Sequence, residues 1–156
     1  MKSKQDIYKI TAIVFIIDQW IKLIISHTMK EYDKIVVIPK FFNIQYVKNK
    51  GAAFSILENN TLFLIIISVL FIIVINKMIK KEKNFTKLSC LSLGMILGGV
   101  FGNLIDRIIY HSVIDFLAFK IISYDFPVFN IADIGITVGT FLLFLALLLD
   151  KKKEEE

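Results

Sequence analysis

TLFLIIISVLFIIVINKMI, residues 61–79, is a predominantly apolar stretch of 19 residues. Its length is close to the roughly 20 residues that an α-helix needs to cross the roughly 30 Å hydrocarbon core of a bilayer. Lipid offers the backbone no hydrogen-bond partners, so only helices and closed barrels can span it, and an apolar run of this length is helical. The stretch therefore predicts a transmembrane helix.

Three further apolar runs accompany this one, at about residues 10–25, 88–109 and 131–149. The chain is 56% hydrophobic with a mean hydropathy of +0.67, which is more apolar than a soluble domain of 156 residues usually is. We therefore expect an all-α membrane protein with four transmembrane helices. At this length a single domain over residues 1–156 is the expected organisation.

The lysines indicate how these helices are oriented. With four spans, the N-terminal segment, the connection between the second and third helices, and the C-terminal tail share one side of the membrane. These short segments carry eleven of the nineteen basic residues, which predicts that both termini are cytoplasmic. The lysines cluster beside apolar runs and form no basic, aromatic-rich face, so the net charge of +5 does not indicate nucleic acid as a partner.

The two outer loops differ in character. The first, about residues 27–60, contains a stretch at 41–48 that partly alternates apolar and polar residues, as a half-buried strand does. We expect a small extracytoplasmic β-sheet there. The second, about residues 111–129, is short and very apolar, which predicts a loop lying in the membrane interface.

Costly polar side chains gather at one level of the predicted bundle. The first helix places them in its outer half, the third at its outer end, and the fourth at its outer start. The residues concerned are Asp18, Lys22, Asn103, Asp106, Arg107, Asn130 and Asp133, with Asp115 just after the third helix. Ionisable groups inside a membrane are expensive and commonly functional, so we expect a site near the extracytoplasmic surface.

Spacing along the helices adds detail to this level. Asp18 and Lys22 are one turn apart and can pair, either as part of the site or as an ion pair that only fixes the first helix. Glycines recur at every fourth position, at Gly94, Gly98 and Gly102. Small residues in such a stripe let neighbouring helices approach closely, so we expect close packing along the third helix.

Asp115 and Asp133 are a pair of carboxylates, and such a pair can activate a water molecule to attack an amide bond. Two close carboxylates share one proton, so one can act as a base while the other donates a hydrogen bond. Three alternatives remain open on the residues alone. Either carboxylate could simply cap a helix or pair with a cation. The same aspartates could serve a small transporter or proton-conducting bundle, or the chain could be a non-catalytic assembly factor.

Metal and disulfide chemistry have little support in the composition. The single cysteine, Cys90, is expected to be a small packing residue. The histidines His27 and His111 lack the spacing of metal ligands, so we predict no metal site and no cofactor.

Four short motifs resemble those of the lipoprotein signal peptidases (signal peptidase II). They are NKGAAF at residues 49–54, GGVFGNLIDR at 98–107, VIDF at 113–116 and FNIADI at 129–134. Asp18 and Gln19, with Lys22, are similar to the polar feature of that family's first helix. Each motif alone is weak, but together, in this order and spacing, they are highly specific.

The resemblance implies an aspartyl endopeptidase of the bacterial cytoplasmic membrane. Its substrates would be prolipoproteins whose lipobox cysteine carries a diacylglyceryl group, cleaved just before that cysteine among membrane lipids. The cyclic peptide globomycin would inhibit it. Matched by motif, the catalytic residues are Asp115 and Asp133, and the substrate-binding or supporting residues are Asn49, Asn103, Arg107, Asn130, Asp18, Lys22 and Asp106.

Overall fold

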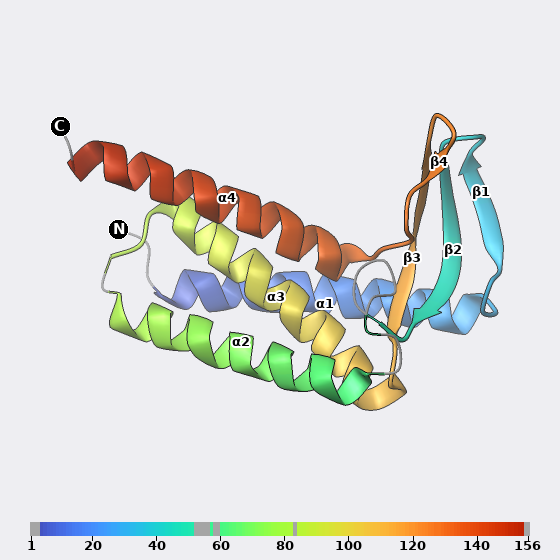
Figure 1. Cartoon of the computed structure of the whole chain (residues 1–156), viewed down its shortest axis with the longest axis horizontal. Coiled ribbons are helices and arrows are strands. Elements are labelled where there is room, and N and C mark those ends of the chain that lie inside the picture. Colours follow the sequence, from blue (N-terminus) through green and yellow to red (C-terminus); the bar gives the residue numbers. More distant parts are fainter. Residues whose placement is uncertain (1–3, 52–56, 58–59, 83, 155–156) are drawn as a thin grey trace.

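The computed structural model describes residues 4–51, 57, 60–82 and 84–154, and the side chains of these residues as far as residue 150. Its helices are α1 (Lys4–Thr28), α2 (Thr61–Lys81), α3 (Lys87–Tyr110) and α4 (Ile131–Glu154). They lie side by side in a bundle (Figure 1). All four are long and apolar enough to cross a membrane, which confirms the predicted helices. The expected bounds were too short for α1 and α4, whose helical structure continues into charged residues beyond the apolar run.

α3 lies between α1 and α4, and glycines allow that position. A Cβ atom at Gly94 would come within 2.6 Å of the Cβ of Ile10, and one at Gly98 would come within 2.7 Å of the Cβ of Val14, both on α1. On the α4 side, a Cβ at Gly99 would collide with the carbonyl oxygen of Ala132. The glycine stripe therefore permits the close helix packing predicted from the sequence.

A four-stranded antiparallel sheet stands across one end of the bundle (Figure 1), which we call the sheet end. Its strands are β1 (Lys34–Ile38), β2 (Phe42–Asn49), β3 (Val113–Ile121) and β4 (Tyr124–Asp125), in that spatial order. β2 corresponds to the strand expected at residues 41–48. β3 pairs with β2 and comes from the connection between α3 and α4, so the sheet joins this connection to the one between α1 and α2.

The prediction that residues 111–129 form a loop was wrong, because most of that segment is β3 and β4. Val113, Ile114 and Phe116 are all buried, so both faces of β3 are covered at its start. A strand buried on both faces shows no alternation in its sequence, which is why its periodicity gave no strand signal. Farther along, the Phe119 ring stacks on that of Phe42, with centroids 4.6 Å apart.

The two ends of the bundle have separate apolar cores. One core lies at the sheet end and contains Ile25, Met29, Tyr46, Ile114 and Phe116. The other lies toward the opposite end and contains Ile7, Ile75, Ile79, Cys90, Leu93 and Leu97. Cys90 is 1% exposed within this second core, which confirms its predicted packing role.

Candidate active site

Asp115 and Asp133 line the same cavity at the sheet end. Asp115 lies on β3 and Asp133 in the first turn of α4. The cavity has a volume of about 680 Å³, and both β-strand and helix residues form its walls. Its apolar wall consists of Val47, Val113, Phe126, Pro127, Val128, Phe129, Ile134, Ile136 and Val138. Two carboxylates therefore face a partly open, largely apolar cavity that is large enough for part of a peptide.

The start of α4 fixes the position of Asp133. Asn130 is the N-cap residue, and its side-chain oxygen accepts a hydrogen bond from the Asp133 backbone N–H at 2.9 Å. The Asp133 carboxylate in turn accepts a bond from the Asn130 backbone N–H at 3.2 Å. This reciprocal pair is a capping box, which satisfies two N–H groups that a helix start would otherwise leave unpaired. Asp133 therefore caps its helix through Oδ2, and its side chain also lines the cavity.

Asparagine amides hold both carboxylates. Asn130 Nδ2 donates to Asp115 Oδ1 at 2.6 Å, and Asn49 Nδ2 donates to Asp115 Oδ2 at 2.9 Å. Asn103 Nδ2 donates to Asp133 Oδ1 at 2.8 Å. The described hydrogen-bond partners of the two aspartates are thus N–H groups. Such groups orient a carboxylate without neutralising its charge.

Burial raises the pKa of Asp115 to about 7. The largest cause is the loss of water around a side chain that is 2% exposed, and the nearby charge of Asp133 adds to it. The hydrogen bonds from Asn49 and Asn130 and the charge of Lys22 act in the opposite direction. A carboxyl group with a pKa near neutrality can exchange a proton under physiological conditions, as general acid–base catalysis requires.

A buried ion triad, Asp18–Lys22–Asp106, lies directly behind this pair. Lys22 Nζ is 2.8 Å from Asp18 Oδ2 and 2.9 Å from Asp106 Oδ2, which confirms the predicted pairing of Asp18 with Lys22. All three side chains are at most 1% exposed. The triad joins α1 to α3 at the level of the cavity.

The triad also holds the backbone beside each cavity aspartate. Asp106 Oδ2 accepts a bond from the Ile114 N–H at 3.1 Å, and Ile114 immediately precedes Asp115. Asp18 Oδ1 accepts a bond from the Ala132 N–H at 2.8 Å, and Ala132 immediately precedes Asp133. One carboxylate of the triad therefore anchors β3 at the site, and the other anchors the first turn of α4.

Arg107 lies half-buried on the cavity wall and bonds backbone carbonyl groups. Its Nη1 donates to the Asn103 carbonyl at 3.3 Å, and its Nη2 donates to the Gly51 carbonyl at 3.2 Å. The Gly51 N–H donates to Asn49 Oδ1 at 2.9 Å. Arg107 thereby ties α3 to the chain just after β2. The rest of the NKGAAF motif, residues 52–54, lies outside the described residues.

Every site residue named from the sequence falls in this one connected group. The sequence named Gln19 only in the resemblance of the first helix and not among the site residues, yet its Nε2 donates to Asp106 Oδ1 at 2.9 Å and to the Gly102 carbonyl at 3.2 Å. The one indication in the sequence was that Gln19 is a polar residue next to Asp18 within a largely apolar helix. Among the described residues, no three His, Cys, Asp or Glu side chains gather as metal ligands would.

Comparison with known proteins identifies the family. The model of the family described as signal peptidase (SPase) II matches residues 10–149. A lipoprotein signal peptidase of Staphylococcus aureus (strain JH9) is 40% identical over 149 residues, covering 94% of this chain and 91% of the relative. The same protein from Staphylococcus aureus (strain Newman) is equally similar.

Two solved structures share the fold. A bacterial membrane enzyme determined by the in meso method at 2.3 Å resolution superposes with a TM-score of 0.87 and 38% identity, over 94% of this chain and 90% of that one. A second, at 1.9 Å resolution, gives a TM-score of 0.80 and 39% identity over 89% and 90%. With a family model that matches most of its length and relatives of this similarity, the chain belongs to the signal peptidase II family, whose members are membrane aspartic peptidases.

Proposed function

We propose that Asp115 and Asp133 are the catalytic dyad with which this peptidase removes signal peptides from prolipoproteins. The supporting observation is that both carboxylates line one apolar-walled cavity. Each carboxylate is held there by N–H donors, and among the described residues neither forms an ion pair. Family membership favours a peptidase over the transporter and assembly-factor hypotheses.

The chemistry follows from one proton shared by two carboxyl groups. The ionised carboxylate takes a proton from a water molecule, whose oxygen attacks the scissile carbonyl carbon. The protonated carboxyl donates a hydrogen bond to the carbonyl oxygen and stabilises the tetrahedral intermediate. When the carbon–nitrogen bond breaks, the proton removed from water passes to the leaving amine. The products are a free carboxyl group on the signal peptide and a free amino group on the lipoprotein.

The apolar wall supports the proposed substrate. The scissile bond would lie just before a diacylglyceryl-modified cysteine, with the acyl chains among membrane lipids beside the helices. We place the sheet end at the extracytoplasmic surface of the bacterial cytoplasmic membrane and both termini in the cytoplasm, on the distribution of lysines. A globomycin-type cyclic peptide would compete for the same cavity. The whole arrangement would be one integral-membrane peptidase domain.

The test is cleavage of a synthetic diacylglyceryl-modified prolipoprotein by detergent-solubilised protein. Asp115→Asn and Asp133→Asn should each lower kcat at least about 100-fold, because positioned acid–base groups contribute about 10²- to 10⁴-fold. Asp125→Asn is the matched control, since Asp125 lies on β4 with a side chain that is 79% exposed. Folded Asp115 or Asp133 variants that cleave at the wild-type rate would exclude the dyad.

A further inference from the structure

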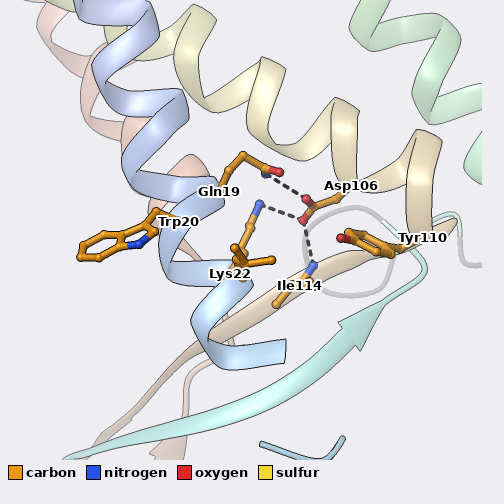
Figure 2. Close-up of a pocket in the computed structure, with 7 residues that line it drawn as sticks. Gln19, Trp20, Lys22, Asp106, Tyr110 and Ile114 are labelled. Carbon is orange, nitrogen blue, oxygen red and sulfur yellow. Dashed lines mark hydrogen bonds and ion pairs between the residues drawn. The ribbon is translucent and has the colours of Figure 1, made fainter. Parts of the chain in front are cut away.

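Lys22 makes a contact that the ion triad does not require. Figure 2 shows its side chain reaching from α1 toward Asp106, beside Gln19. Its Nζ donates to the side-chain oxygen of Asn103 at 3.1 Å, besides its two carboxylate partners. An ammonium group has three hydrogens and no acceptor. The three partners therefore use every hydrogen that Lys22 has.

This contact determines which way the Asn103 amide points. A group that can only donate must meet the amide oxygen, so the NH₂ end of Asn103 faces the other way, toward Asp133. Asn130 Nδ2 also donates to Asn103 Oδ1, at 3.1 Å, but it has two hydrogens for three acceptors and its shortest bond is to Asp115. Of the two donors to Asn103 Oδ1, Lys22 is the one that uses all its hydrogens and has no acceptor, so it excludes the turned amide.

Turning the Asn103 amide over would place its oxygen against an Asp133 oxygen. Two acceptors would then face each other, which disfavours an ionised carboxylate at that place. The dyad needs one ionised member to take a proton from water. The orientation of Asn103 therefore bears on the charge state of the dyad, even though neither Asn103 nor Lys22 exchanges a proton in the reaction.

We propose that Lys22 is a positioning residue that keeps the NH₂ end of Asn103 on Asp133 and thereby favours the singly ionised dyad. The proposal rests on the catalytic roles of Asp115 and Asp133 proposed above. Lys22 acts through Asn103 and does not touch the substrate, because it is 1% exposed and its hydrogens are all in use.

Charge alone could imitate this effect, so the surrounding charges matter. The groups facing Lys22 are Asp18 from α1 and Asp106 from α3. Those facing the dyad are its own two members and Arg107 from α3. Replacing only Lys22 would remove a positive charge near the dyad. Combining its replacement with Asp106→Asn removes one charge of each sign, so the double variant keeps the net charge of the wild type.

The experiment compares two double variants in the Asp106→Asn background, Lys22→Met and Lys22→Gln. They have equal charge and similar size, but only glutamine can donate to Asn103. We measure kcat, KM and the pH dependence of kcat/KM on the diacylglyceryl-modified substrate. The methionine variant should lose at least about tenfold in kcat at neutral pH and move the acid limb of its profile to higher pH, with KM within about twofold of wild type. The glutamine variant should recover much of the lost kcat, and its acid limb should lie close to that of the wild type.

Two further proteins separate positioning from folding. Asp106→Asn alone keeps Lys22 and should not move the acid limb to higher pH. Gln19→Met loosens the same triad without touching the bond from Lys22 to Asn103, so it should lower the melting temperature and leave the acid limb in place. If the methionine variant does not fold, the glutamine variant still decides, because an acid limb moved to higher pH despite a restored donor contradicts the proposal.

Other outcomes overturn the inference directly. A methionine variant with the wild-type acid limb would show that Lys22 does not act on the dyad. This conclusion would hold if the kcat of the variant were unchanged, and also if kcat fell only in proportion to the folded fraction. Failure of the underlying dyad looks different, since Asp115→Asn and Asp133→Asn would then retain turnover. Suppose that Asp115→Asn and Asp133→Asn are inactive but the Lys22→Met double variant keeps the wild-type acid limb. This result would contradict the role of Lys22 and leave the proposed dyad intact.

Discussion

Two pairs of aspartates lie side by side at the sheet end, and their surroundings differ in one respect. Asp18 and Asp106 share the ammonium group of Lys22, at 2.8 and 2.9 Å. Both pairs accept hydrogen bonds from amide N–H groups, but among the described residues Asp115 and Asp133 form no ion pair. The side-chain chemistry is the same in both pairs, and depth in the protein is similar for Asp115 and the triad.

Under the proposed function, this difference distinguishes a structural pair of aspartates from a reactive pair. A cation beside a buried carboxylate compensates its charge, and removing either partner then leaves an uncompensated charge. An amide N–H also favours the ionised carboxylate but carries no full charge, and at Asp115 the effect of burial outweighs it. The triad therefore anchors the backbone before Asp115 and Asp133, while the proposed dyad can hold the proton that its chemistry requires.

The largest expected effect concerns the pH dependence of stability at Asp115. Because its pKa is raised from 3.8 to about 7, the folded protein holds this proton more tightly than the unfolded chain. The resulting stability is fully present below about pH 4 and is lost as the pH rises through about 7. At about 1.4 kcal/mol per pKa unit, the loss amounts to about 4 kcal/mol. Asp115→Asn should lack this loss and be more stable than wild type at pH 8.

Thermal unfolding in detergent between pH 4 and pH 8 measures this difference. Asp125→Asn, which changes an exposed carboxylate, should keep the wild-type slope. An Asp115→Asn protein whose stability falls with pH as steeply as the wild type would show that the dyad carboxyl is not held protonated by the fold.

The next effect concerns the cation-paired aspartates. Asp18→Ala removes a partner of Lys22 and the acceptor of the Ala132 N–H. Breaking a buried ion pair on one side is strongly destabilising, so we expect a loss of about 3 kcal/mol in the free energy of unfolding. Denaturation in mixed micelles measures it, with Asp125→Ala as the exposed control. Equal, small losses in both variants would mean that the triad does not hold the structure together.

The smallest effect belongs to a charge pair at the surface of the sheet. Lys48 Nζ lies 3.8 Å from Glu31 Oε2, and their side chains are 44% and 34% exposed. Exposed pairs contribute about 0–1 kcal/mol and are screened by salt. Glu31→Gln should therefore change the unfolding free energy by less than about 1 kcal/mol, and less still at high salt. A loss approaching that of Asp18→Ala would contradict the distinction between buried and exposed pairs.

The sequence predicted much of the site before any contact was known. Asp18 and Lys22 are one helical turn apart, so their pairing follows from helix geometry alone. The level of the other polar groups followed from counting residues along each predicted helix. The role of Gln19 did not follow, because a single polar residue on a helix gives no indication of the partner it will meet.

The fold was predicted less evenly. Long apolar runs have no structure in lipid other than a helix, so the membrane-spanning helices could be read directly. β3 could not, because its start is covered on both faces and its sequence therefore does not alternate. The sheet thus took in a segment expected to lie as a loop in the membrane interface.

By itself the sequence determined the four helices, the end of the bundle where polar groups gather, and the motifs that identify the family. Which aspartates pair with a cation, and which do not, depends on the tertiary structure. The reason is physical: Lys22 and Asn103 are 81 residues apart in the chain and meet only because the helices pack. The direction in which the Asn103 amide points depends on every donor and acceptor around it, and these come from α1, from the N-cap residue Asn130 and from α4.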